Sequence, residues 1–115
     1  MTARNQVVLF LRLMKAAAHE RFVFVGRRVN LETLARLGIT RRHAQALVVG
    51  LKPEDYASGP SPDHSNPGRE MWVFGLQVTG SEVYVQLQVI VEPARCVCVS
   101  FHESERPMHY PFPRD

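Results

Sequence analysis

The stretch that decides the fold runs from Met71 to His102 and reads MWVFGLQVTGSEVYVQLQVIVEPARCVCVSFH. It contains three β-rich runs separated by two turn-forming segments. The runs cover residues 71–78, 82–91 and 95–101, and the turns are Thr79-Gly80-Ser81 and Glu92-Pro93-Ala94. Runs rich in β-branched and aromatic residues and bounded by such turns predict consecutive antiparallel strands. The third run is apolar on both faces, which is typical of a central strand.

The middle run alternates between apolar and mixed positions, as expected for a strand with two different faces. The alternation assigns Val83, Val85, Leu87, Val89 and Val91 to one face, and Tyr84, Gln86, Gln88 and Ile90 to the other. The third run ends at His102, which we expect beside this second row. Histidine titrates near neutral pH and is well placed for acid–base work at the end of a rigid strand.

The segment before these strands predicts helices. Apolar residues at three–four spacing indicate a helix over residues 5–19, and residues 22–25 form a short β-rich run. Two shorter helices are expected, over residues 31–37 with Asn30 as N-cap and Gly38 at the end, and over 41–49 with Thr40 and Gly50 in the same roles. Helices followed by a meander predict one α+β domain over residues 1–115, with N-terminal helices packed on a curved antiparallel sheet of three or more strands.

Two segments fit neither a helix nor a strand. Residues 58–68 carry several prolines and glycines and predict a long loop, and loops of that length are often functional. The tail from residue 103 onward carries three further prolines, with Tyr110 and Phe112 as an aromatic brace. Each segment holds a histidine, His64 in the loop and His109 in the tail.

Composition excludes several classes of protein. The sequence has no apolar run long enough to span a membrane and no signal peptide, so a cytoplasmic location is expected. Cys96 and Cys98 would point to the same face of a strand, where they cannot easily pair, and two such ligands do not make a zinc site. We therefore expect two buried small side chains, and neither a metal nor a cofactor.

Charge is distributed unevenly along the chain. Residues 1–50 hold nine Lys and Arg against two Glu, whereas residues 51–115 hold five against nine Asp and Glu. Arginine provides twelve of the fourteen cations, and its guanidinium binds phosphate bidentately. A basic face suits a polyanion such as RNA, although arginines that only solvate helix surfaces would give the same count.

Four short motifs together resemble a known family. They are Gly50-Leu51-Lys52-Pro53-Glu54-Asp55-Tyr56, Trp72-Val73-Phe74-Gly75, Gly80-Ser81-Glu82-Val83-Tyr84-Val85 and Val99-Ser100-Phe101-His102. In order and spacing, over residues 22–113, they resemble the MqsR family of toxin–antitoxin ribonucleases. The resemblance implies a RelE-like fold, metal-independent cleavage of mRNA, and a cognate antitoxin, with a homodimer or a toxin–antitoxin hetero-oligomer as the assembly.

The resemblance also implies roles for individual residues. Tyr84 matches the family's strand tyrosine, and His102 matches the basic residue that ends the last strand. Ser58, Val73 and Gln86 stand where family members carry a lysine, a glutamine and a lysine. The candidate residues are, for catalysis, His102, Tyr84 and His64, and for RNA or phosphate binding, Arg69, Arg106, Gln86 and His109.

Cleavage without a metal needs a base for the 2′-hydroxyl, a cation for the phosphorane and an acid for the leaving oxygen. His102 is expected as acid or base. His64 is expected in the opposite role, with His109 as the alternative to His64. Arg69 or Arg106 would supply the cation. This mechanism predicts that RNA is cut and matching DNA is not.

Three other functions fit parts of the sequence. A family member weakened by the three departures would bind RNA or antitoxin without cutting. A protein–protein module would dock a partner through an exposed strand and the proline-rich tail. A DNA-binding regulator would use residues 30–49 as a helix-turn-helix, with Arg41, Arg42 and His43 reading bases.

Overall fold

The computed structural model describes residues 2–114, which form three α-helices and a five-stranded sheet. The helices are α1 (Arg4–Glu20), α2 (Arg28–Leu37) and α3 (Arg41–Val49), followed by the 3-10 turn η1 (Pro53–Asp55). The strands are β1 (Phe22–Phe24), β2 (Tyr56–Pro62), β3 (Glu70–Val78), β4 (Ser81–Ile90) and β5 (Arg95–Glu103). The predicted α+β class, with helices preceding the sheet, is confirmed.

The sheet has the order β1-β5-β4-β3-β2. The three strands predicted between Met71 and His102 form its antiparallel centre, and β2 extends it antiparallel to β3. The short strand β1 instead pairs parallel with β5, so the sheet is mixed rather than wholly antiparallel. This pairing brings residues 22–24 beside residues 96–98 and makes β5 a central strand, as its apolar sequence predicted.

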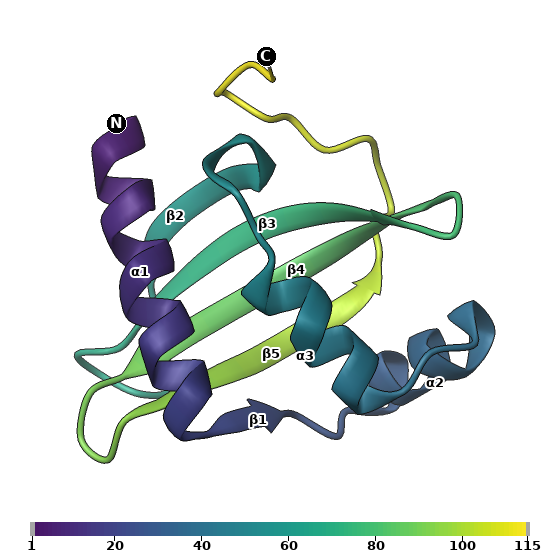
Figure 1. The fold of residues 1–115 in the computed structure, drawn as a ribbon, viewed down its shortest axis with the longest axis horizontal. Helices are drawn as coiled ribbons and strands as arrows, with labels where there is room; N and C mark the ends of the chain where they lie inside the picture. Colours follow the sequence, from purple (N-terminus) through teal and green to yellow (C-terminus); the bar gives the residue numbers. More distant parts are fainter. Residues whose placement is uncertain (1, 115) are drawn as a thin grey trace.

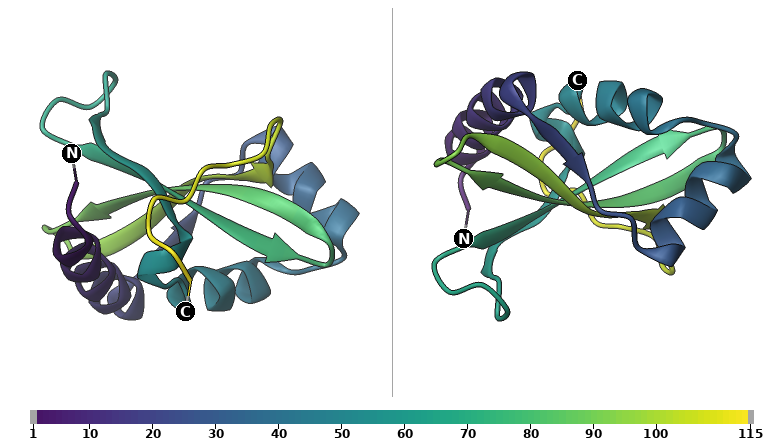
Figure 2. Two further views of the ribbon diagram at one scale, coloured as in Figure 1. Left: turned by 90° about the horizontal axis from the view of Figure 1, so that it is seen from above. Right: turned by 90° about the horizontal axis from the view of Figure 1, so that it is seen from below.

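Helices α1 and α3 cover one face of the sheet (Figure 1). Figure 2 shows the connection between β2 and β3 on the opposite side from these helices. The core between helices and sheet contains Phe10 of α1 stacked on Trp72 of β3, with ring centroids 4.3 Å apart, and the fully buried Phe74 and Phe101. We call the face turned away from α1 and α3 the outer face.

The β3–β4 hairpin closes through a two-residue turn. Thr79 and Gly80 have φ angles of 46° and 84°, and Val78 pairs with Ser81 across the turn. Positive φ at both turn positions matches the right-handed twist of the flanking strands, and glycine adopts it without steric cost. At the other end of β4, the alternation predicted for the strand stops early, because Val91 lies beyond the strand and is 82% exposed.

Two local predictions are wrong. Asn30 is not an N-cap: α2 begins at Arg28, and Asn30 lies inside the helix with no exposed surface. Residues 58–68 are not a single loop, because Tyr56–Pro62 forms the edge strand β2. Proline lacks a backbone N–H and is tolerated in edge strands, where that group would face outward. The predicted caps Thr40 and Gly38 are confirmed, Thr40 by a 3.0 Å bond from the His43 amide and Gly38 by its left-handed conformation.

Within residues 2–114, no helix combines the length and the apolar character that crossing a membrane requires.

Candidate functional site

A β-bulge in β5 determines which side chains reach the outer face. Leu87 pairs with Cys98, and the preceding residue Gln86 pairs with Ser100, so Val99 is an extra residue in β5. A bulge shifts the alternation of a strand by one position. Cys98 therefore lies in the core before the bulge and Phe101 lies in the core after it, each with no exposed surface. As a result, Ser100 and His102 point to the outer face.

Asn30 satisfies backbone groups at the β5 bulge and just after the end of β1. Its side-chain amide donates to the carbonyls of Val99 (3.0 Å) and Val25 (2.9 Å), and its carbonyl oxygen accepts from the Phe101 amide (3.1 Å). Strand β1 has ended at this point, so the Asn30 side chain continues the hydrogen bonding along β5. A buried helical residue thereby fixes the strand end that carries His102.

His102 and Tyr84 form a pair on the outer face. They are register partners on β5 and β4, and their rings stack with centroids 5.1 Å apart at 16°. The His102 Nδ1 lies 3.1 Å from the Glu103 carbonyl oxygen, which can only accept, so the contact is a hydrogen bond in the tautomer that carries its proton on Nδ1. In the neutral ring this leaves Nε2 with a free lone pair. The expected proximity of His102 to the polar row of β4 is therefore present.

The C-terminal tail closes one side of this pair. The Tyr110 hydroxyl and the Met108 amide donate to the two carboxylate oxygens of Glu82, at 2.9 and 3.0 Å. A Cβ atom on Gly75 would lie 2.0 Å from the Tyr110 hydroxyl oxygen, so only glycine allows the tyrosine to lie on β3 here. Phe112 packs on Tyr56 with ring centroids 5.6 Å apart, which extends the predicted aromatic brace.

A cavity of about 440 Å³ lies between the tail and the outer face. It brings together four of the predicted site residues, one from β4, one from β5 and two from the tail: Tyr84, His102, Arg106 and His109. Ser58 and Val73, which occupy positions where the family has a lysine and a glutamine, line the same cavity. The cavity therefore contains two imidazoles, a phenol and a guanidinium, without those two family side chains.

His64 and Arg69 are not part of this cavity. The loop that carries them is held by Asp63, whose carboxylate accepts from Gln88 at 2.7 Å and from Asn66 at 3.0 Å, and these hydrogen bonds lower the pKa of Asp63. Gln88 lies four residues from Tyr84 along β4, or about 13 Å. The structure thus does not bring His64 to the His102–Tyr84 pair.

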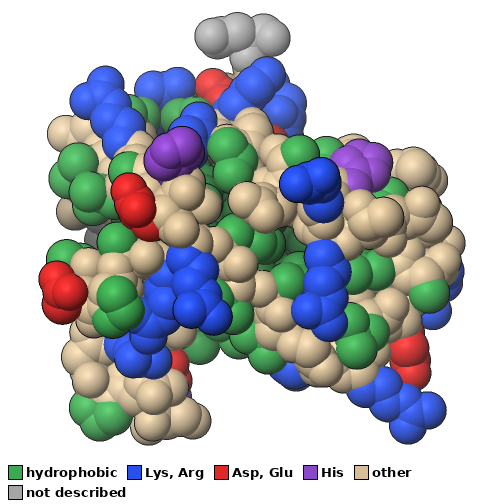
Figure 3. All heavy atoms as spheres, turned by 60° about the horizontal axis from the view of Figure 1, so that its bottom comes forward, with side chains coloured by type: hydrophobic (Ala, Val, Ile, Leu, Met, Phe, Trp, Pro, Cys, Tyr) green, Lys and Arg blue, Asp and Glu red, His purple; other side chains and the backbone are tan. Residues whose placement is uncertain are grey.

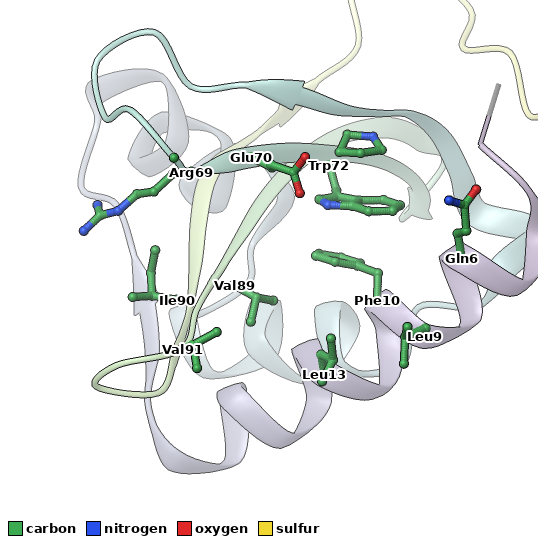
Figure 4. Close-up of a pocket in the computed structure, with 12 residues that line it drawn as sticks. Gln6, Leu9, Phe10, Leu13, Arg69, Glu70, Trp72, Val89, Ile90 and Val91 are labelled. Atoms are coloured by element: carbon green, nitrogen blue, oxygen red, sulfur yellow. The ribbon is translucent and has the colours of Figure 1, made fainter.

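Arg69 lies at a second cavity, of about 610 Å³, between α1 and the ends of β3 and β4. Figure 4 shows its guanidinium directed away from Trp72 and Phe10, which form the apolar floor. Leu9 and Leu13 of α1 border this cavity and are more than half exposed. Of the two predicted phosphate cations, only Arg106 is therefore placed at the candidate site.

Sequence reasoning missed one arginine on the outer face. The Arg27 guanidinium donates to the Ser100 hydroxyl at 2.9 Å, and that hydroxyl donates to the Gln86 carbonyl oxygen at 3.2 Å. The basic pair Arg27-Arg28 was visible in the sequence. However, the contact with Ser100 joins residues 73 positions apart, which no local pattern reveals.

Positive charge extends beyond this site. On the face shown in Figure 3, Lys and Arg side chains are more widespread than Asp and Glu. Arg41 of α3 lies over the Phe24 ring, 5.8 Å from its centroid, so part of its surface is engaged by the protein itself. Positive charge spread over so much of the surface can attract a polyanion, but it does not by itself show where the polyanion binds.

The cysteines fall outside the candidate site, and the described residues form no cluster of metal ligands. Cys96 and Cys98 are free and fully buried, as expected, and burial raises the pKa of the Cys96 thiol to about 12 and that of Cys98 further. Such thiols stay protonated and unreactive at neutral pH. Among residues 2–114, no three His, Cys, Asp or Glu side chains are grouped to hold a metal ion.

The docking of the tail should weaken at high pH. Burial, reinforced by the neighbouring Glu82 carboxylate, raises the pKa of Tyr110 from 10.0 to about 12. Because the folded-state pKa is raised, the stabilisation is complete below pH 10 and is lost as the pH approaches 12. A tyrosinate absorbance titration should show a late step that Tyr110→Phe removes. If the variant keeps the late step, another tyrosine is responsible and the tail contact is not as described.

The sequence was compared with known proteins. It matches no protein-family model and no curated protein. The likeness to the MqsR family therefore rests on the four motifs and their order in the chain.

Proposed function

We propose that the protein is a metal-independent endoribonuclease that cleaves mRNA, and the toxin of a toxin–antitoxin pair. The observation that carries this proposal is the His102–Tyr84 stack on the outer face, enclosed with Arg106 and His109 in one cavity. An imidazole, a phenol and a guanidinium can supply the base, the acid and the cation that 2′-hydroxyl attack needs when no metal is used.

In this mechanism His102 Nε2 removes the proton of the 2′-hydroxyl or, when protonated, donates to the leaving 5′-oxygen. Tyr84 donates a proton or binds the phosphate, and Arg106 stabilises the phosphorane charge. Since His64 is remote, His109 is the better candidate for the opposite proton-transfer role. Each proton-transfer group is expected to contribute about 10²–10⁴-fold.

The remaining parts of the proposal follow from the family resemblance. A cognate antitoxin would be the protein partner, and the pair would act in the cytoplasm, where mRNA is available. The excess of Arg over Asp and Glu in residues 1–50 supports a polyanionic substrate.

Incubating the purified protein with a mixed-sequence RNA in the presence of EDTA tests this function. We expect cleavage that EDTA does not inhibit, and no cleavage of DNA of the same sequence, because DNA lacks the attacking hydroxyl. Cutting of the DNA would exclude the mechanism, and an intact RNA would exclude the activity.

A second candidate function is supported by the lining of the cavity. Ser58 and Val73 are neutral, and they lie where a lysine and a glutamine would add a charge and an amide to the site. This favours a weakened family member that binds RNA or antitoxin without cutting. Salt-dependent RNA binding without cleavage would identify it.

A further inference from the structure

Arg27 is held on the outer face by a buried partner. It immediately precedes α2, and its Nη1 donates to Ser100, a residue that is only 2% exposed. The Ser100 hydroxyl is itself held by its hydrogen bond to Gln86. A guanidinium fixed in this way loses less side-chain freedom when it binds a ligand than an unanchored one would.

The charge of Arg27 is not neutralised by the protein. Four other arginines have a carboxylate partner: Arg4 with Glu54, Arg28 with Glu32, Arg36 with Glu103, and Arg114 with Asp55. Among residues 2–114, no carboxylate lies within 4.0 Å of a nitrogen of Arg27 in this way. A guanidinium has five N–H donors, and the bond to Ser100 uses one. The others remain for an anion.

Ser100, which holds Arg27, lies two residues along β5 from His102 of the candidate catalytic pair. Gln86 and Ser100 are register partners on the outer face, as are Tyr84 and His102. The two pairs are two residues apart along each strand, or about 6.6 Å. A nucleic-acid strand lying along the sheet would therefore meet the two pairs in succession.

We propose that Arg27 binds a backbone phosphate of single-stranded RNA, adjacent to the phosphate at the Tyr84–His102 pair. The inference rests on the proposed function for the identity of the ligand. Ser100 is the positioning residue. Gln86 uses its carbonyl oxygen to accept from Ser100, which leaves its amide nitrogen to donate to the same phosphate. The subsite holds the strand in register and is independent of base sequence.

Arg28 provides a matched control. It is the next residue in the chain, its side chain is 92% exposed, and it pairs with Glu32 at 2.8 Å. Replacing either arginine with glutamine removes the same charge from neighbouring positions. Only the Arg27 change removes a guanidinium that is anchored beside the candidate site.

The test measures binding of a fluorescent, 2′-O-methylated mixed-sequence oligonucleotide over a range of KCl concentrations, using the parent, Arg27→Gln and Arg28→Gln. The modified strand lacks the attacking hydroxyl, so binding is observed without cleavage. We expect Arg27→Gln to weaken binding about tenfold at low salt. It should also reduce the slope of log affinity against log salt by about 0.7, the value for one phosphate of a single strand. Arg28→Gln should stay within about twofold of the parent.

Equal effects of the two substitutions, or no effect of Arg27→Gln, would overturn the subsite, as would a parent that does not bind the oligonucleotide. Cleavage of unmodified RNA is measured separately with the same preparations. If binding depends on Arg27 but RNA stays intact, the subsite stands and the proposed activity fails. If RNA is cut but binding does not depend on Arg27, the activity stands and the subsite fails.

Discussion

Replacing His102 with alanine should slow RNA cleavage by roughly 10²–10⁴-fold, the usual contribution of a proton-transfer group. The imidazole stacks on Tyr84 at 5.1 Å and is only partly buried, so its removal should leave the core intact. The rate is measured in EDTA with substrate in excess. Binding of a 2′-O-methylated strand should change much less than the rate, because the lost group acts mainly on the transition state.

His64→Ala is the control for this prediction. His64 is an exposed histidine in the loop between β2 and β3, and its neighbour Asp63 binds Gln88, which lies about 13 Å along β4 from Tyr84. Its removal should leave the rate within about twofold of the parent, since it is too far away for direct proton transfer. Equal rates for His102→Ala and the parent would move the chemistry away from the outer-face pair.

Replacing Asn30 with alanine should lower the free energy of unfolding by roughly 3 kcal/mol or more. The substitution removes the partner of the Val99 carbonyl and the Phe101 amide at the β5 bulge and of the Val25 carbonyl just after β1, and each buried unsatisfied group costs about 1–3 kcal/mol. That loss is a large part of the roughly 5–15 kcal/mol that stabilises a typical domain. Urea unfolding followed by the fluorescence of Trp72, the single tryptophan, measures it.

Glu32→Ala is the matched control, because Glu32 lies on the same helix and forms a surface ion pair with Arg28. Its loss should cost about 0.5 kcal/mol or less. If Asn30→Ala proved as mild as Glu32→Ala, the hydrogen bonds to Val25, Val99 and Phe101 would not be what fixes the bulge.

The central strands were predictable because the residues that define them are close together in the sequence. Alternating residues and turn chemistry between Met71 and His102 define three consecutive strands, and the register of the hairpins then follows from the turns. The adjacency of β4 and β5 also follows, since neighbouring strands of a meander pair in order, whereas the pairing of His102 with Tyr84 depends on the extra residue Val99. The edge strand β2 was not predicted, because its glycine and prolines are typical of loops.

The features that complete the site depend on contacts between distant parts of the chain. Asn30 has the chemistry of a helix cap, namely a short side chain that satisfies backbone groups. Here it performs that chemistry on β5, about seventy positions later. In the sequence, nothing distinguishes Arg27 from the other arginines, because its partner Ser100 lies 73 positions away. The bulge at Val99 and the docking of the tail on Gly75 are not marked by any periodic pattern in the sequence.

At the bulge of Val99, the even-numbered residues of β5 change from one face of the sheet to the other. Before it, even-numbered residues such as Cys98 face the helices, and after it, even-numbered residues such as His102 face away from them. Pairing the same residues without a bulge would keep the even-numbered residues on one face, turning the imidazole of His102 toward the core and the Phe101 ring toward water. Deleting Val99 would instead leave a regular strand in which Cys98, Phe101 and His102 keep their present faces. The face on which His102 lies therefore depends on whether the one extra residue of β5 is accommodated as a bulge.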